Sequence, residues 1–173
     1  MFAWLKPPAT APLQEGRRLI DAIGWAAVLP QLLAALGAVF AAAGVGEVIG
    51  GATRYVIPEG NIFLTLLVFA FGMVLFTMIM GNAFAAFPVM AAAIGVPILI
   101  HGDGGNPAVI GAVGMLSGFC GTLMTPMAAN FNIVPVALLE LKSQYAVIRV
   151  QAPTAVALLA ANIAILYVAG FHL

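Results

Sequence analysis

Two short segments combine hydrogen-bonding side chains with residues that interrupt helices, inside an otherwise apolar sequence. The first contains Gly81, Asn82 and Pro88, and the second contains Thr122, Thr125, Pro126, Asn130 and Asn132. Proline cannot donate a backbone hydrogen bond, and it disfavours helix at the preceding residue. We therefore predict that a helix stops near Gly81 and that the next one starts near Pro88. In the second segment, Asn132 is predicted to cap a short helix with Pro135 in its first turn.

Helix breaks of this kind can bind small ions. The start of a helix presents free N–H groups and a partial positive charge that suit a carboxylate, whereas unwound carbonyls suit a cation. Membrane transporters use broken helices in this way. The five Asn and Thr side chains beside the breaks exceed what packing requires. The three residues named for the first segment and the five named for the second are therefore the predicted substrate-binding residues. The alternative is that the amides only join helices and that glycines such as Gly114 and Gly118 only permit close packing.

The composition indicates the environment in which these breaks lie. Hydrophobic residues make up 64% of the chain, charged residues make up 7%, and the mean hydropathy is +1.14. A soluble domain would have too little polar surface, so the chain is predicted to be an all-α, multi-pass membrane helix bundle in contact with the lipid bilayer. The net charge of zero argues against nucleic acid as a partner.

The residue types in the sequence also argue against an enzyme. The sequence contains no evident nucleophile–base pair, metal-ligand cluster or acidic dyad. The single cysteine, Cys120, lies in an apolar run and is interpreted as a buried hydrophobic residue. His101 and Asp103 are interpreted as part of a solvated turn rather than a gate or metal site.

The charged residues divide the chain into apolar stretches. We predict a cytoplasmic N-terminal segment at 1–21 and a transmembrane domain at 22–173. The domain would contain a span at about 22–46, a hairpin or two spans at 60–100, a broken span at 104–139, and a span at 152–172. These lengths follow because about 20 apolar residues cross a bilayer.

The basic residues predict the orientation. Lys6, Arg17 and Arg18 precede the first span, and Lys142 and Arg149 precede the last, so the positive-inside rule places both groups in the cytoplasm. The segment 47–59 would then be an external loop, and an odd number of crossings would separate residues 60 and 140. This parity does not distinguish a re-entrant hairpin from two full spans. The break near Gly81 favours the re-entrant form.

Three stretches carry a resemblance to a known family. They are Glu15-Gly-Arg-Arg-Leu-Ile-Asp21, Met78-Ile-Met-Gly-Asn-Ala-Phe-Ala-Ala-Phe-Pro88, and the region from Gly118 to Pro135 with the Thr-Leu-Met-Thr-Pro and Asn-Phe-Asn elements. From about residue 15 to its end, the chain resembles the larger subunit of bacterial two-subunit 5-oxoproline (pyroglutamate) transporters. The resemblance implies uptake of a small cyclic carboxylate across the bacterial inner membrane, together with a second membrane subunit.

The implied fold is similar to that of the ion-transporter superfamily, whose inverted repeats each contain a re-entrant hairpin and a broken helix. Members of the transporter family are longer, and the chain looks like their C-terminal portion, so it would supply one repeat of a presumed pair. The expected mechanism is alternating access without a cofactor. Because no acidic residue lies beside the breaks, coupling to Na⁺ through carbonyls or to H⁺ at another position both stay open. The alternatives are a non-transporting assembly or scaffold subunit, or a truncated half-carrier.

Overall fold

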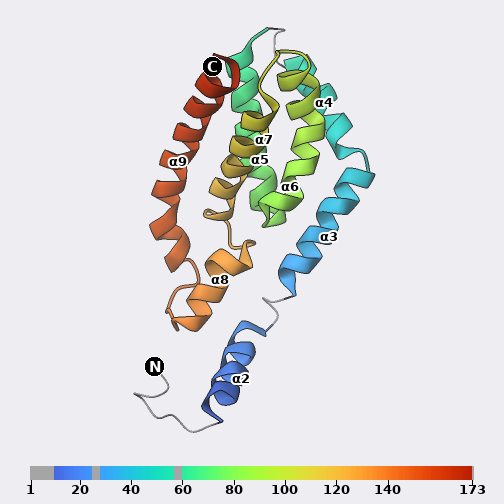
Figure 1. Ribbon diagram of the computed structural model, residues 1–173. Helices are drawn as coiled ribbons and strands as arrows, with labels where there is room; N and C mark the ends of the chain where they lie inside the picture. Colours follow the sequence, from blue (N-terminus) through green and yellow to red (C-terminus); the bar gives the residue numbers. More distant parts are fainter. Residues whose placement is uncertain (1–9, 25–27, 57–59, 173) are drawn as a thin grey trace.

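The computed structural model describes residues 10–24, 28–56 and 60–172, and these residues form helices without strands (Figure 1). The helices are α2 (Ala11–Ile23), α3 (Leu29–Ala42), α4 (Val45–Val56), α5 (Ile62–Met80), α6 (Ala83–Met90), η2 (Ala91–Ile100), α7 (Pro107–Thr122), α8 (Ala129–Leu138) and α9 (Ala146–Phe171). The prediction of an all-α bundle is confirmed. Lys6, on which the predicted orientation also relied, lies outside the described residues.

Several helices are long and apolar enough to cross a membrane. Within the described residues, three such helices cover Ile62–Met80, Ala83–Ile100 and Ala146–Phe171. A bent pair, Ala35–Ala42 and Val45–Thr53, gives a fourth span if its two parts cross together. The chain is therefore a multi-pass helical membrane protein.

The first apolar stretch differs from its predicted boundaries. Helix α3 ends at Ala42, and the chain bends by 63° before α4 begins at Val45. Gly44 has a φ of 71°, a conformation that glycine adopts without the steric penalty of a side chain. The segment 47–59 was expected to be an external loop, but it is helical as far as Val56. The sequence predicts a loop here because the segment contains charged residues such as Glu47. In the fold, this segment is helical as α4 and packs against η2.

The hairpin formed by α5 and α6 turns at Gly81 and Asn82. Gly81 adopts a left-handed conformation with a φ of 72°, which ends α5 as the sequence predicts. The predicted restart near Pro88 is wrong, because the Asn82 side chain accepts a hydrogen bond from the Phe84 N–H at 2.8 Å and starts α6 at Ala83. Pro88 lies inside this helix. The helix then widens into the π-helix η2, an adjustment that membrane helices use around proline.

The arms of this hairpin bear on its topology in two ways. With 19 and 18 residues, each arm is long enough for a full span. Figure 1 shows, however, that the tip of the hairpin lies above the lower ends of α3 and α9, next to α8. The re-entrant hairpin and the pair of full spans therefore both remain compatible with the fold.

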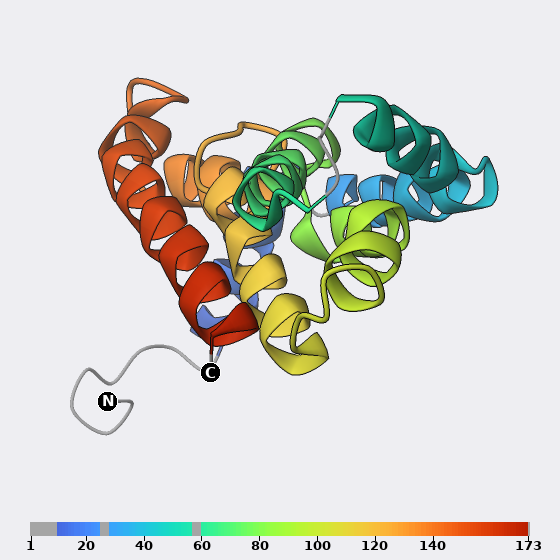
Figure 2. The same cartoon turned by 90° about the horizontal axis from the view of Figure 1, so that it is seen from above.

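Helix α7 lies at the centre of the bundle and packs against α5 and α9. Figure 2 shows α9 and the α3–α4 pair on opposite sides, with the hairpin and α7 between them. The largest core cluster joins these elements through fully buried side chains: Leu66, Phe69, Met73, Met90, Ile94, Leu99, Ile110 and Leu166. Helix α7 crosses the hairpin closely at Gly114, Gly118 and Gly121. Side-chain or backbone atoms of the hairpin occupy the space that a Cβ at these positions would need.

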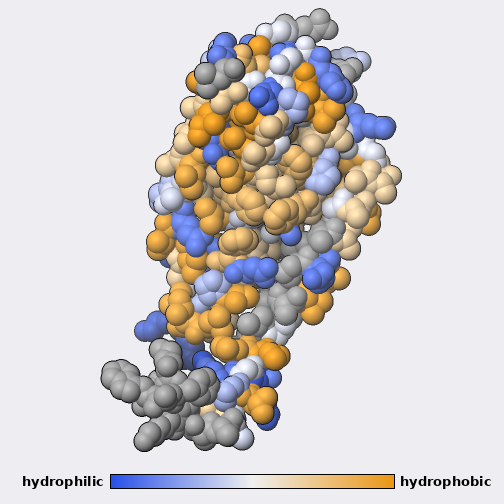
Figure 3. Space-filling model, viewed as in Figure 1, coloured by the Kyte–Doolittle hydropathy of each residue, from blue (hydrophilic) through white to orange (hydrophobic). Residues whose placement is uncertain are grey.

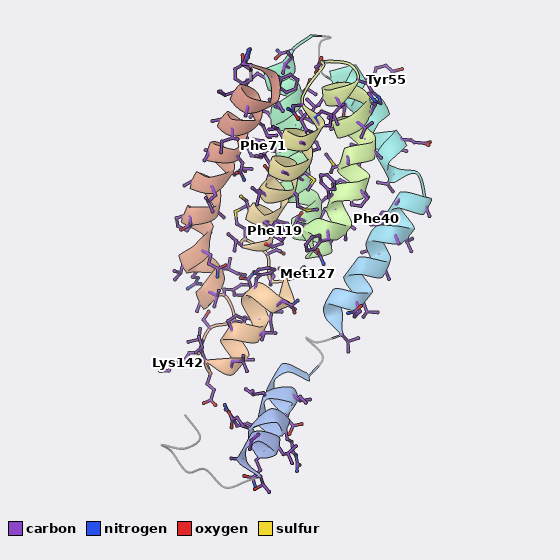
Figure 4. The ribbon with its side chains drawn as sticks, in the orientation of Figure 1. Phe40, Tyr55, Phe71, Phe119, Met127 and Lys142 are labelled. Carbon is purple, nitrogen blue, oxygen red and sulfur yellow. The ribbon has the colours of Figure 1, made fainter. Side chains whose placement is uncertain are left out.

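The segments that carry most basic residues lie at one end of the bundle. Arg18 Nη1 lies 3.8 Å from Glu140 Oε1, so α2 contacts the end of α8. Lys142 lies at the same end, and the C-terminus lies at the opposite end (Figures 1 and 4). The helix that carries Arg17 and Arg18 therefore lies at the same end of the bundle as Lys142, and the cytoplasmic location of this end stays a prediction.

The turn between η2 and α7 contains a partly buried acid. The Asp103 N–H donates to the Ile98 carbonyl at 2.8 Å, while Asp103 Oδ2 is buried without a hydrogen-bond partner among the described residues. Burial raises the pKa of the Asp103 carboxyl above its ordinary value of 3.8. The predicted turn therefore contains a carboxylate that the fold disfavours in its charged form.

Replacing Asp103 by asparagine is expected to raise the melting temperature at pH 7. A raised pKa means that the fold favours the protonated carboxyl, so the stability due to this group is present below pH 3.8 and is lost as the pH rises through the folded pKa. The gain from Asp103→Asn should therefore shrink as the pH falls from 7 to 4. Thermal unfolding of the detergent-solubilised protein across this range measures the effect. Asp21→Asn, at an exposed position, is the control, and a gain for Asp103→Asn that does not change with pH contradicts the assignment.

Candidate functional site

The two helix breaks meet in the middle of the chain's fold. The Thr125 hydroxyl, in the loop between α7 and α8, donates to the Met78 carbonyl near the end of α5 at 2.8 Å. Beside this contact is a cavity of ≈ 200 Å³. Its lining residues come from the hairpin tip, the end of α7 and the start of α8: Gly81, Asn82, Phe84, Phe119, Thr122, Met127, Ala128, Ala129, Asn130 and Phe131. Phe119 and Met127, labelled in Figure 4, lie between the lower end of α6 and the start of α8.

The predicted site residues separate into three groups. Gly81, Asn82, Thr122 and Asn130 line the cavity. Thr125 and Asn132 do not line it but form hydrogen bonds that hold the break between α7 and α8. Pro88 lies within α6, and Pro126 lies exposed in the loop, so neither lines the cavity.

Asn132 supports the break rather than capping α8. Helix α8 starts at Ala129, so Asn132 is already within its first turns, and Pro135 lies further inside the helix than predicted. The Asn132 Nδ2 donates to the Thr122 carbonyl at 2.8 Å and to the Thr125 carbonyl at 2.6 Å. Asn132 is fully buried at 0% exposure. Its amide therefore satisfies the Thr122 carbonyl at the end of α7 and adds a second donor to the Thr125 carbonyl, which also accepts from the Ala128 N–H at 3.4 Å.

Thr125 connects the two breaks. Its hydroxyl donates to the Met78 carbonyl and accepts a hydrogen bond from the Met127 N–H at 3.2 Å. Thr125 is buried, with 3% exposure. This side chain therefore fixes the loop after α7 against the hairpin tip and sets the position of the cavity wall.

Two helix starts face the cavity. Helix α6 begins at Ala83 and is capped by the Asn82 side chain, whereas α8 begins at Ala129 without a side-chain cap. The first turn of a helix carries a partial positive charge. Several N–H groups at these two starts already have acceptors, because the Phe84 N–H donates to the Asn82 side chain and the Ala129 and Phe131 N–H groups donate to the Met127 and Ala128 carbonyls. None of the lining residues is acidic or basic. The electrostatics of the cavity therefore favour a small anion over a cation.

Three phenylalanines form an aromatic wall that the sequence did not reveal. The Phe84 and Phe119 rings are 5.5 Å apart, and the Phe119 and Phe131 rings are 6.5 Å apart, both with edge-to-face geometry. In the sequence these residues resemble any other phenylalanine of an apolar helix. The available signal was their proximity to the polar residues, since Phe84 follows Asn82 by two positions and Phe131 lies beside Asn130.

The described residues do not bring together three His, Cys, Asp or Glu side chains that could hold a metal ion. Within the same part of the chain, the site consists of amides, one hydroxyl, backbone groups and apolar side chains. Such a set can bind and orient a ligand by hydrogen bonds and ring contacts.

Comparison with known proteins gives a family without an assigned activity. No curated protein and no solved structure matches the chain. The family described as "Protein of unknown function (DUF979)" matches residues 1–171. Because this match covers nearly all of its 173 residues, the chain is a member of the DUF979 family.

Proposed function

We propose that the protein is a carrier subunit that transports 5-oxoproline or a similar small carboxylate across the bacterial inner membrane by alternating access. The observation that carries this proposal is the cavity at the meeting point of two helix breaks, with two helix starts and no charged lining residue. The resemblance of segments 78–88 and 118–135 to 5-oxoproline transporters supports the choice of substrate.

The cavity chemistry fits a ring that carries one carboxylate. The helix starts at Ala83 and Ala129 would receive the carboxylate, because their partial positive charges favour an anion. Asn82, Thr122 and Asn130 would provide hydrogen bonds to a lactam. The phenylalanine wall would contact the ring. An apolar cavity of about 150 Å³ accepts a benzene molecule, so a volume of ≈ 200 Å³ suits a small substituted ring.

A second membrane subunit is part of the proposal. Asn130 is exposed, and Phe84 has 64% of its surface exposed on the same cavity. An amide that faces hydrocarbon without a partner is unfavourable by several kcal/mol, so protein or water must cover it within a membrane. We propose that the second subunit covers this side, that the N-terminus is cytoplasmic, and that the protein acts as a carrier rather than an enzyme. Coupling to Na⁺ or H⁺ would involve groups outside the cavity lining.

Replacing Asn130 by alanine is expected to reduce uptake of labelled 5-oxoproline by about 10-fold, the effect of losing one hydrogen bond of roughly 1.4 kcal/mol to the ligand. The side chain makes no hydrogen bond with the described residues, so membrane abundance should not change. Cells that express the chain with its neighbouring membrane subunit provide the assay, and immunoblotting measures abundance.

Asn61→Ala is the matched control. Asn61 caps α5 by accepting from the Leu64 N–H, at the far end of that helix from the hairpin turn, so the variant loses an amide without touching the cavity. Unchanged uptake by Asn130→Ala, or an equal loss in both variants, contradicts the site. Uptake that does not depend on the chain supports the alternative of a scaffold subunit or half-carrier.

A further inference from the structure

Helix α2 separates its side chains into an apolar and a charged face. The residues of one face recur every three to four positions along α2, and they are uncharged: Pro12, Leu13, Gly16, Leu19 and Ile20. The other face carries Gln14, Glu15, Arg17, Arg18 and Asp21. This arrangement is typical of a helix that lies between an apolar and an aqueous phase.

Only one edge of the apolar face of α2 packs on the protein, and the other edge is exposed. Toward the bundle, Gly16 and Leu19 are half-buried, and Arg18 lies 3.8 Å from Glu140 at the end of α8. On the apolar face, Leu13 is 77% exposed and Ile20 is 71% exposed. Figure 3 shows hydrophobic and hydrophilic surface side by side in this lower region, and Figure 1 shows α2 below the packed bundle. The bundle therefore leaves the edge of the apolar face that carries Leu13 and Ile20 uncovered.

The position of α2 in the chain points to lipid as the partner. Helix α2 ends at Ile23, and α3 begins at Leu29 and contains the first part of the bent span, Ala35–Ala42. So short a connection keeps α2 close to the surface at which the chain enters the membrane. An apolar helix face at that level meets the boundary between headgroups and acyl chains.

The charges of α2 indicate which lipid chemistry matters. Arg18 Nη2 lies 2.6 Å from Glu15 Oε1, and Arg17 Nε lies 3.7 Å from Asp21 Oδ2. The hydrogen bond from Arg18 lowers the pKa of the Glu15 carboxyl, so this pair stays ionised at neutral pH. Two basic and two acidic residues leave the face without net charge. Attraction to anionic headgroups is therefore not required, and the apolar side chains supply the contact.

We infer that α2 is an interfacial helix that inserts Leu13 and Ile20 into the acyl boundary of the bilayer, next to the first span. The inference does not depend on the proposed transport function. It adds a contact with the bilayer surface to the expectation that segment 1–21 is a cytoplasmic segment. The charged face remains free to contact water and the end of α8 through Glu140.

The test uses the full chain with Cys120→Ser, which removes a buried cysteine, and four single replacements: Leu13→Cys, Ile20→Cys, Gln14→Cys and Arg17→Cys. Each cysteine is labelled with a polarity-sensitive fluorophore, and the protein is reconstituted into phosphatidylcholine vesicles with and without brominated acyl chains. Labels at positions 13 and 20 are expected to emit at shorter wavelength and to be quenched roughly twofold more by bromolipid than labels at 14 and 17.

Two results would overturn the inference. Equal quenching at all four positions would show that the apolar face does not enter the bilayer. Shielding from water at 13 and 20 without bromolipid quenching would identify protein, a second copy or another subunit, as the occupant. Because the four positions are exposed on α2, the replacements should leave the bundle folded, and matching elution on size exclusion checks this.

Discussion

Replacement of Asn132 by leucine is expected to cause a large loss of stability, although the two side chains have similar shapes. The variant leaves the Thr122 and Thr125 carbonyls without their amide donor at a position with no solvent access. The Thr125 carbonyl keeps the Ala128 N–H as a donor at 3.4 Å, whereas the Thr122 carbonyl is left without a partner, which is unfavourable by about 1–3 kcal/mol. Thermal unfolding in detergent and the yield of folded protein measure the effect.

Asn130→Leu is the matched control for this experiment. Asn130 lies two residues away in the same helix, but its side chain is exposed and makes no hydrogen bond with the described residues. Its melting temperature should stay close to that of the natural protein, while uptake falls. A melting temperature for Asn132→Leu that equals that of Asn130→Leu would contradict the supporting role. The pair thus distinguishes damage to the fold from loss of a ligand contact.

Replacement of Gly121 by alanine is expected to disrupt the crossing of α5 and α7. A Cβ at this position would lie 2.6 Å from the Val74 carbonyl oxygen and 3.0 Å from the Thr77 Cβ. The first contact is with helix backbone, which cannot rotate away as a flexible side chain would. Overpacking of this kind is unfavourable by about 1–3 kcal/mol, and the affected crossing lies one residue from Thr122 in the cavity wall.

Gly111→Ala makes the same chemical change in the same helix. No atom lies within 4 Å of the Cβ that this variant would add. Alanine favours helix over glycine by about 1 kcal/mol, so this variant should be neutral or more stable. We therefore expect the two melting temperatures to shift in opposite directions. A shift of the same sign and size in both variants would show that the close approach at Gly121 does not limit packing.

Local sequence rules identified the ends of helices well where one residue controls the backbone. Gly81 ends α5 because glycine adopts the left-handed conformation that a helix end requires. The rule for proline failed at Pro88, because the Asn82 cap starts the helix earlier and the following π-helix accommodates the missing N–H. Propensity describes one residue and its neighbours, whereas the packing of α6 against α5, α3 and α7 decides which segment stays helical.

The different roles of Asn130 and Asn132 were not predictable from the sequence. Both are asparagines in one apolar segment, and both follow the break at Pro126. In the fold, Asn132 turns inward to the carbonyls of the break, while Asn130 lies exposed at the cavity. Two positions along a helix differ by about 200° in direction, so neighbouring residues of the same type can face opposite environments.

By itself, the sequence determined that the protein is a multi-pass bundle of apolar helices and that its helices break near residues 81 and 125. These properties depend on composition and on residues that act within one or two helix turns. The tertiary structure alone decided that the two breaks meet, through the Thr125 hydroxyl and the Met78 carbonyl, and that three phenylalanines form one wall of the cavity between them. The reason is physical: residues 47 positions apart in the chain come into contact only when the packing of whole helices places them there.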